Sequence, residues 1–303
     1  MALPPTCLSL FSGGGGLDLG LHSLGFRTVC YVEREAYAAS CLVARMEEAA
    51  LDSAPIWSDV GTFDGRPWRG VVDCVTGGSP CQDLSVAGKR AGLDGERSGL
   101  FWEFVRIVRE VQPALVSWEN VGGATSALPR VCEAFEAEGY AGAVVKVRAS
   151  DVGAPHQRAR VFLLAYRDGD GLALLRGLGL LDGERAAQRD DADGCGEGLG
   201  HASGCGVEGG RSGRVGIASA SAEETLPRCA GHEFPPTRGD AEGWADYLAR
   251  GGPAPAQPRI CRGVDGVASW VESAWADRLR LLGNGVVPQQ AAAAFRFLAR
   301  RLR

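Results

Sequence analysis

The chain has 303 residues, of which 45% are hydrophobic, and a formal net charge of −5. This length suits one large domain with a smaller one, and the acidic balance excludes a uniformly basic nucleic-acid binder while leaving room for a local basic cleft. No apolar run reaches about 18 residues and the first residues lack a signal-peptide pattern, so we expect neither a membrane span nor secretion. The ten cysteines have no disulfide framework, which predicts a reducing cytoplasm.

Strand-like and helix-like segments alternate over residues 6–165. The expected strands are residues 6–11, 28–32, 56–59, 71–76, 114–118, 140–147 and 160–165. Helices are expected after Gly16 and after a capping Ser98, and over residues 36–50 and 129–138. This alternation predicts an α/β fold with a doubly wound, mostly parallel, Rossmann-like sheet. The carboxyl ends of parallel strands share one edge of a sheet, and that edge should carry Phe11, Glu33, Asp59, Cys81 and Glu119.

The composition changes at Asp168. Residues 1–167 form the expected catalytic domain, and residues 168–257, rich in Gly, Ala, Asp and Arg, are expected to form a small loop-rich domain. Residues 258–303 end in an alanine-rich helix over 291–301 and are expected to return to the first domain. Five residues of the middle region could suggest zinc, namely Cys195, His201, Cys205, Cys229 and His232. Their spacings fit no common zinc module, so no metal is expected.

Cys81 follows an apolar run, Val71–Val75, and a loop of two glycines, a serine and a proline. A thiol at such a strand end is partly exposed, and nearby positive charge or amide dipoles can favour the reactive thiolate. The alternative is an ordinary small buried side chain.

A glycine-rich turn, Gly13–Gly16, links the first strand to the first helix. Its backbone can approach a ligand closely, and Glu33 at the end of the next strand can accept from ribose hydroxyls, as in nucleoside-cofactor sites. The alternative is a plain tight turn, and the spacing differs from the nicotinamide pattern GxGxxG. Asp59 either accepts from an adenine amino group or caps a turn.

Three further charged positions are candidates for chemistry. Glu119 ends an apolar strand, where a carboxyl can have a raised pKa, or else forms a strand-end salt bridge. Arg158 and Arg160 can clamp a phosphate or a base carbonyl, or else form a solvated edge. The loop over residues 82–99 has hydroxyl and basic side chains that suit closure over a polyanion.

Taken in order, these segments resemble the motifs of the DNA (cytosine-5)-methyltransferases, and most closely the short prokaryotic or phage-type members. The matching stretches are FSGGGGLDLG (11–20), Pro80-Cys81-Gln82, Glu119-Asn120-Val121, Gln157-Arg158-Ala159-Arg160 and Gly283-Asn284-Gly285-Val286-Val287-Pro288. The resemblance covers residues 6–165 and 258–297. The family's ninth motif is hard to align, and Arg259 or Arg262 is the candidate for its arginine.

The resemblance implies S-adenosyl-L-methionine as cofactor and assigns roles to residues. Cys81 is the expected nucleophile, Glu119 protonates or hydrogen-bonds the base, and Arg160, helped by Arg158, holds its carbonyl oxygen. The expected cofactor-binding residues are Phe11, Gly13, Gly15, Gly16, Leu17, Glu33, Asp59, Val60, Pro80, Leu100 and Asn284. Expected DNA contacts are Gln82, Ser85, Lys89, Arg90 and Arg97, with Arg211, Arg214 and Arg238 as candidates for sequence readout.

The predicted function is methyl transfer to carbon 5 of a cytosine flipped out of double-stranded DNA, through a covalent cysteine adduct. A restriction-modification or phage system, a partner restriction endonuclease, a monomeric state and a place in the bacterial cytoplasm and nucleoid are expected with it. The alternatives are a catalytically silent homologue that binds DNA and cofactor, an RNA cytosine methyltransferase and, more distantly, a nicotinamide oxidoreductase.

Overall fold

A computed structural model describes residues 3–80, 99–167, 169–181 and 276–302, together with residue 249 and the backbone of residues 217–219 and 269–275. The described strands are β1 (Thr6–Leu10), β2 (Arg27–Val32), β3 (Ile56–Trp57), β4 (Cys74–Gly77), β5 (Leu115–Val121), β6 (Tyr140–Val147), β7 (Arg160–Arg167) and β8 (Ile217–Ser219). The described α-helices are α1 (Gly16–His22), α2 (Ala36–Glu47), α3 (Gly99–Val111), α4 (Leu128–Ala137), α5 (Asp170–Gly177), α7 (Ser269–Asn284) and α8 (Pro288–Arg301). Short 3-10 helices include η1 (Val60–Thr62) and η2 (Arg66–Trp68).

The strands form one sheet in the order β3-β2-β1-β4-β5-β7-β6-β8. The pairs from β3 to β5 are parallel, β7 is antiparallel to both β5 and β6, and β8 is parallel to β6. The chain order reverses between β1 and β4, which is where doubly wound folds bind ligands. The predicted doubly wound, mostly parallel sheet is therefore confirmed.

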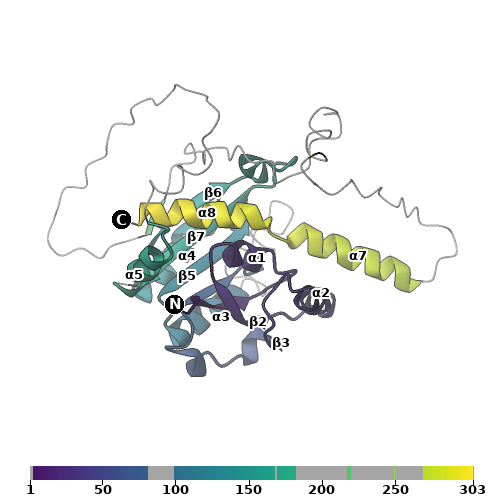
Figure 1. Cartoon of the computed structure of the whole chain (residues 1–303), viewed down its shortest axis with the longest axis horizontal. Helices are drawn as coiled ribbons and strands as arrows, with labels where there is room; N and C mark the ends of the chain where they lie inside the picture. The colour runs from purple at the N-terminus through teal and green to yellow at the C-terminus, as the bar shows by residue number, and fades with distance from the viewer. Residues whose placement is uncertain are drawn as a thin grey trace.

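Two helical layers cover the sheet. Apolar side chains of α3 and α4 join Leu8, Leu10 and Trp118 in the core on one face. Those of α1 and α8 join Cys7, Cys74 and Leu115 on the other. In Figure 1, α8 (yellow) lies across the strands near β7, α1 lies beside it, and α7 continues away from it toward α2. The predicted return of the C-terminal helix to the first domain is confirmed, although the helix begins earlier, at Pro288.

Two predicted strands are wrong by three residues at one end, for identifiable reasons. The strand expected at residues 71–76 begins only at Cys74, since Val71 is 57% exposed and belongs to a turn that follows η2. The strand expected at residues 114–118 continues to Val121, because Glu119, Asn120 and Val121 pair with Phe162, Val161 and Arg160 of β7. Glu119 is thus within β5, not beyond its end.

Part of the region that was expected to form the second domain packs on the first. Helix α5 lies against β7 with Leu175 fully buried, and β8 extends the sheet beside β6. Most of residues 182–268 lie outside the described residues. In the part of the chain that is described, no helix is long and apolar enough to cross a membrane.

Candidate active site

Glu119 and Arg160 meet at the carboxyl edge of the parallel strands. Because β7 runs antiparallel to β5, its first residue lies opposite Val121, at the end of β5. The Arg160 Nε atom is 2.8 Å from Glu119 Oε1, and both side chains are 8% exposed. Within the part of the chain that the structure describes, neither of these two atoms has a partner with hydrogen-bond geometry. The pair is therefore held close together while keeping unused hydrogen-bonding capacity, which suits a polar ligand.

Burial raises the pKa of Glu119 to about 7, against the opposing influence of the positive charges on Arg160 and Arg158. A carboxyl group with such a pKa exchanges its proton readily near neutral pH. The raised pKa predicted for Glu119 is confirmed in direction, and the ion pair given as the alternative is present as well.

The residues that lead to Cys81 are fixed around Glu119. The indole Nε1 of Trp118 donates to Ser79 Oγ at 3.0 Å, and Asn120 Nδ2 donates to the Ser79 carbonyl oxygen, also at 3.0 Å. At Gly78, a Cβ atom would lie 2.6 Å from Glu119 Oε2, so a larger residue there would have to displace the carboxylate. Cys81 lies outside the described residues, as do the five expected DNA contacts Gln82, Ser85, Lys89, Arg90 and Arg97. Pro80, which is bonded to Cys81, is described and lies two residues from Gly78.

The glycine-rich turn after β1 lies on the same edge. Phe11, Gly13 and Gly15 all have left-handed backbone angles, with φ of 54°, 55° and 75°. The Gly13 N–H donates to Glu33 Oε2 at 2.6 Å, and the Glu35 N–H donates to Glu33 Oε1 at 2.8 Å. The Glu33 carboxylate, at the end of β2, is thus held against the glycine-rich turn. This is the arrangement expected if Glu33 and the turn bind the same ligand.

The other expected cofactor residues of the first domain lie nearby in the fold. Asp59 caps η1 by accepting from the Gly61 N–H at 2.9 Å, which is the capping role named as its alternative. Val60 is buried in the α3-side core, and Phe11 and Leu100 pack against that same core. These three apolar residues therefore all belong to, or border, the core on the α3 side of the sheet.

The C-terminal segment closes the turn from the other side. At Gly16, a Cβ atom would collide with the carbonyl oxygen of Val286, and at Gly14 it would lie 3.5 Å from Leu281. Asn284 ends α7 in this same segment. The expected final motif therefore lies directly against the glycine-rich turn.

Arg158 and Arg160 both donate to the Gly283 carbonyl oxygen, through Nη2 at 2.7 Å and 3.4 Å, but their other partners differ. Arg160 is buried, which contradicts the solvated edge given as the alternative. Arg158 has an unusual backbone φ of 24°. Its Nη2 donates to the carbonyl oxygens of Leu282 at 2.9 Å and Gly283 at 2.7 Å, and also to that of Gly285. Arg160 instead faces Glu119.

Sequence reasoning missed several supporting residues. Trp118 and Ser79 form the buried hydrogen bond described above, and neither was singled out. Gln290, which is fully buried in α8, donates through Nε2 to the carbonyl oxygens of Val147 and Arg158, both at 2.9 Å. Its position just after the final motif was the only signal in the sequence.

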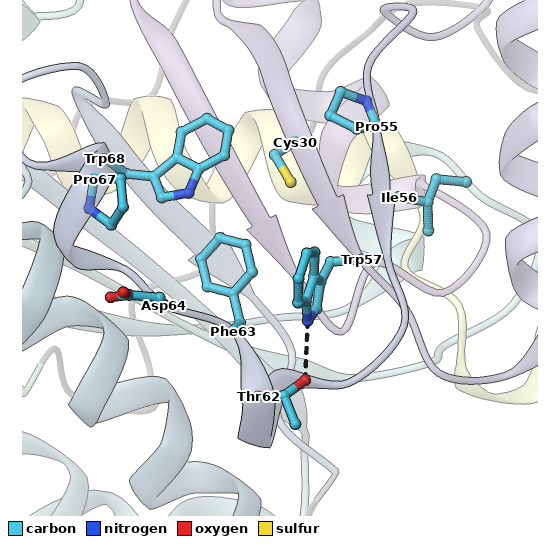
Figure 2. A pocket seen from close by; sticks show the side chains of 9 residues that line it. All are labelled: Cys30, Pro55, Ile56, Trp57, Thr62, Phe63, Asp64, Pro67 and Trp68. Atoms are coloured by element: carbon cyan, nitrogen blue, oxygen red, sulfur yellow. Dashed lines mark hydrogen bonds between the residues drawn. The ribbon is translucent and has the colours of Figure 1, made fainter.

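A separate apolar pocket of about 400 Å³ opens at the β3 edge of the sheet. Figure 2 shows Trp57, Phe63 and Trp68 around it, with the Trp57 indole donating to Thr62 Oγ1 at 3.1 Å. None of the residues predicted for the cofactor or the base lines it. Its lining residues Trp57 and Thr62 flank the Asp59–Val60 segment in the sequence.

Comparison with known proteins identifies the family. The family model of the C-5 cytosine-specific DNA methylases matches residues 6–179, more than half of this 303-residue chain. The chain belongs to this family. The family and enzyme class predicted from the motifs are confirmed.

Similar proteins include several Type II methyltransferases. M.AquIA of Picosynechococcus sp. is 36% identical over 178 residues, which cover 54% of this chain and 72% of that protein. M.Eco47II of Escherichia coli is 38% identical over 118 residues, which cover 39% of this chain and 27% of that one. Among solved structures, the methyltransferase EhMeth of Entamoeba histolytica is 15% identical, with a TM-score of 0.46 and 53% of that chain covered. Apart from M.AquIA, the chain spans about half or less of the length of these proteins.

Membership of the family implies S-adenosyl-L-methionine as the cofactor. The described residues fit it. Among the described residues, a Cβ atom at Gly13 would approach only the Phe11 carbonyl oxygen, at 4.0 Å, so a ligand can come close to this backbone. The Glu33 carboxylate beside it supplies acceptors for hydroxyl groups.

Proposed function

We propose that this chain transfers a methyl group from S-adenosyl-L-methionine to carbon 5 of a cytosine in double-stranded DNA, through a covalent adduct with Cys81. The observation that carries the proposal is the buried Glu119–Arg160 pair beside Gly78, three residues from the cysteine and at the same sheet edge as the glycine-rich turn. A proton-exchanging carboxyl, a fixed cation and a thiol are the groups that this reaction needs.

Cys81 acts as the nucleophile under this proposal. Carbon 5 of cytosine is too weak a nucleophile to accept a methyl group without activation. The thiolate adds to carbon 6, and the electron pair of the carbon 5–carbon 6 double bond moves toward carbon 5 and ring nitrogen 3. After carbon 5 has gained the methyl group it loses its proton to solvent, and the thiolate leaves carbon 6 as the double bond re-forms.

Glu119 and Arg160 stabilise the charge that develops on the ring. Glu119, with a pKa of about 7, donates a proton or a hydrogen bond to ring nitrogen 3. Arg160 offers N–H donors to the carbonyl oxygen of the base. Because both groups are already buried and mutually fixed, little reorganisation is needed when the base arrives.

The cofactor supplies an electrophilic methyl group on a sulfonium centre. The glycine-rich turn, Glu33, Asp59 and the segment around Asn284 bind and orient it next to the base site. Val60, Leu100 and Phe11 provide the apolar surface against which a purine ring packs.

A cytosine stacked in a duplex cannot reach a site this deeply placed, so the base is flipped out of the helix. We further propose that the basic residues 89, 90 and 97 contact the DNA, that the enzyme works as a monomer, and that it acts on DNA in the bacterial cytoplasm and nucleoid. A partner restriction endonuclease is consistent with the Type II names of its relatives.

Incorporation of label from methyl-labelled S-adenosylmethionine into duplex DNA tests the proposal. We expect incorporation into DNA and none into a structured RNA, and bisulfite sequencing of DNA from expressing cells then gives the methylated context. Well-folded protein that binds cofactor but methylates no DNA would support the silent homologue, and label in RNA alone would support the RNA enzyme.

Cys81→Ser is the decisive variant, because a hydroxyl is a far weaker nucleophile than a thiolate at neutral pH. We expect turnover to be abolished while calorimetric cofactor affinity stays close to that of the wild type. Near-full activity in this variant would refute the covalent role of Cys81. Substitution of Cys132, a described cysteine far along the chain in α4, is the matched control and should leave turnover intact.

A further inference from the structure

The carbonyl oxygens at the end of α7 converge on one nitrogen atom. Arg158 Nη2 shares its two hydrogens among the carbonyl oxygens of Leu282, Gly283 and Gly285, to which it donates, and Arg160 Nη2 donates to Gly283 O at 3.4 Å. The last carbonyl groups of a helix have no partners within it, and a cation near them also complements the helix dipole. Arg158 thus fixes the turn formed by residues 283–285.

That turn connects two parts of the candidate site. On one side, Leu281 and Val286 contact Gly14 and Gly16 of the glycine-rich turn. On the other side, Arg158 is two residues from Arg160, which faces Glu119. Gln290 holds the Arg158 backbone to α8 through the Arg158 carbonyl oxygen. Among the described residues, the hydrogen bonds of the Arg158 guanidinium run to carbonyl oxygens at the end of α7, although its positive charge also acts on Glu119.

We propose that Arg158 is a positioning residue: its guanidinium holds the 283–285 turn against the glycine-rich turn and so sets the affinity for the cofactor, without touching the base. This inference rests on the proposed function and separates the two arginines of one motif. Arg160 serves the base, and Arg158 serves the cofactor through Asn284 and its neighbours.

The test compares Arg158→Met with Arg160→Met by calorimetric titration with S-adenosylmethionine and by steady-state methylation. Hydrogen bonds from a charged group are strong. Loss of the Arg158 bonds to the 282–285 carbonyl oxygens should therefore raise the cofactor Kd about tenfold or more. The kcat of Arg158→Met at saturating cofactor should change far less. Arg160→Met should give the opposite split, with a large fall in kcat and a nearly unchanged cofactor Kd.

Arg69→Met is a matched control. Arg69 also donates to carbonyl oxygens at the end of a helix, those of Arg109 and Glu110 in α3, and these bonds, in the described part of the chain, do not involve the glycine-rich turn. We expect it to leave cofactor Kd unchanged. A Kd increase in Arg158→Met no larger than that of Arg69→Met would overturn the inference.

A double-mutant cycle guards against simple misfolding. If Arg158 acts through the turn that carries Asn284, adding Arg158→Lys to Asn284→Ala should weaken cofactor binding little beyond Asn284→Ala alone, whereas fully additive effects would contradict the inference. The proposed function is judged separately, on the wild type. A wild-type chain that binds cofactor without methylating DNA would refute that function alone, whereas active wild type with an unaffected Arg158→Met would refute only the role of Arg158.

Discussion

Replacing Glu119 by glutamine should change how stability depends on pH. The Glu119 carboxyl is buried, and its pKa is raised from an ordinary 4.5 to about 7. A raised pKa means that the folded protein prefers the protonated carboxyl. The stabilisation is therefore fully present below about pH 4.5 and is lost as pH rises through about 7. Glutamine has the same shape and no proton to lose, so Glu119→Gln should lack this dependence.

The size of the effect follows from the two pKa values. They differ by about 2.5, and each pKa unit corresponds to about 1.4 kcal/mol, so the wild type should lose about 3 kcal/mol relative to Glu119→Gln as the carboxyl ionises. Most of this change falls between about pH 5 and pH 8. The buried Asp18, with a pKa raised to about 6 by desolvation, is present in both proteins and cancels in the comparison.

Urea unfolding of both proteins at several pH values measures the difference directly. We expect the free energy of unfolding of the wild type, minus that of the variant, to decrease steadily over this range. A difference that stays constant, or one that grows with pH, would mean that Glu119 is already ionised at about pH 5 and that its ion pair with Arg160 outweighs its burial. The same titration should appear as a fall in kcat above about pH 7.

Three further predictions concern neighbouring residues. Gly78→Ala should lower kcat about 100-fold in methylation assays with little change in cofactor Kd. The reason is that the alanine Cβ would lie 2.6 Å from Glu119 Oε2 and would displace the carboxylate. An unchanged kcat would mean that the position of the carboxylate is unimportant. Arg160→Met should move the alkaline limb of the kcat profile to higher pH, since the Arg160 charge lowers the Glu119 pKa; a limb moving to lower pH would contradict this. Gly16→Ala should weaken calorimetric cofactor binding, because its Cβ would push away the Val286 carbonyl, and cofactor affinity equal to that of the wild type would show that this contact is dispensable.

The sequence predicted the edge of the sheet well because that prediction needed only strand direction. The alternation of strands and helices indicated that the strands before Phe11, Glu33 and Asp59 are parallel. The ends of parallel strands must lie at one edge of the sheet. The length of β5 could not be predicted in this way. Glu119 looks like a strand end in the sequence, and only the pairing with β7, from a distant part of the chain, extends the strand past it.

The arginine motif shows a different limit. Two arginines two positions apart should point the same way only if the backbone between them is extended. The left-handed conformation of Arg158 breaks that condition, and the acceptors that stabilise it come from the end of a helix more than a hundred residues later. The link between Trp118 and Ser79 was also hidden, since a tryptophan in an apolar run looks like core alone.

The packing of α8 on α1 has a consequence for how the protein is made. Gly20 of α1 lies so close to Ala291 that a Cβ atom on it would be 2.8 Å from the alanine methyl, and Leu21 is 2% exposed beneath this contact. On the ribosome, α1 emerges long before α8 has been synthesised. The apolar face of α1 therefore stays exposed while the residues between the two helices are translated. Nascent chains should therefore depend on chaperones until α8 has been synthesised.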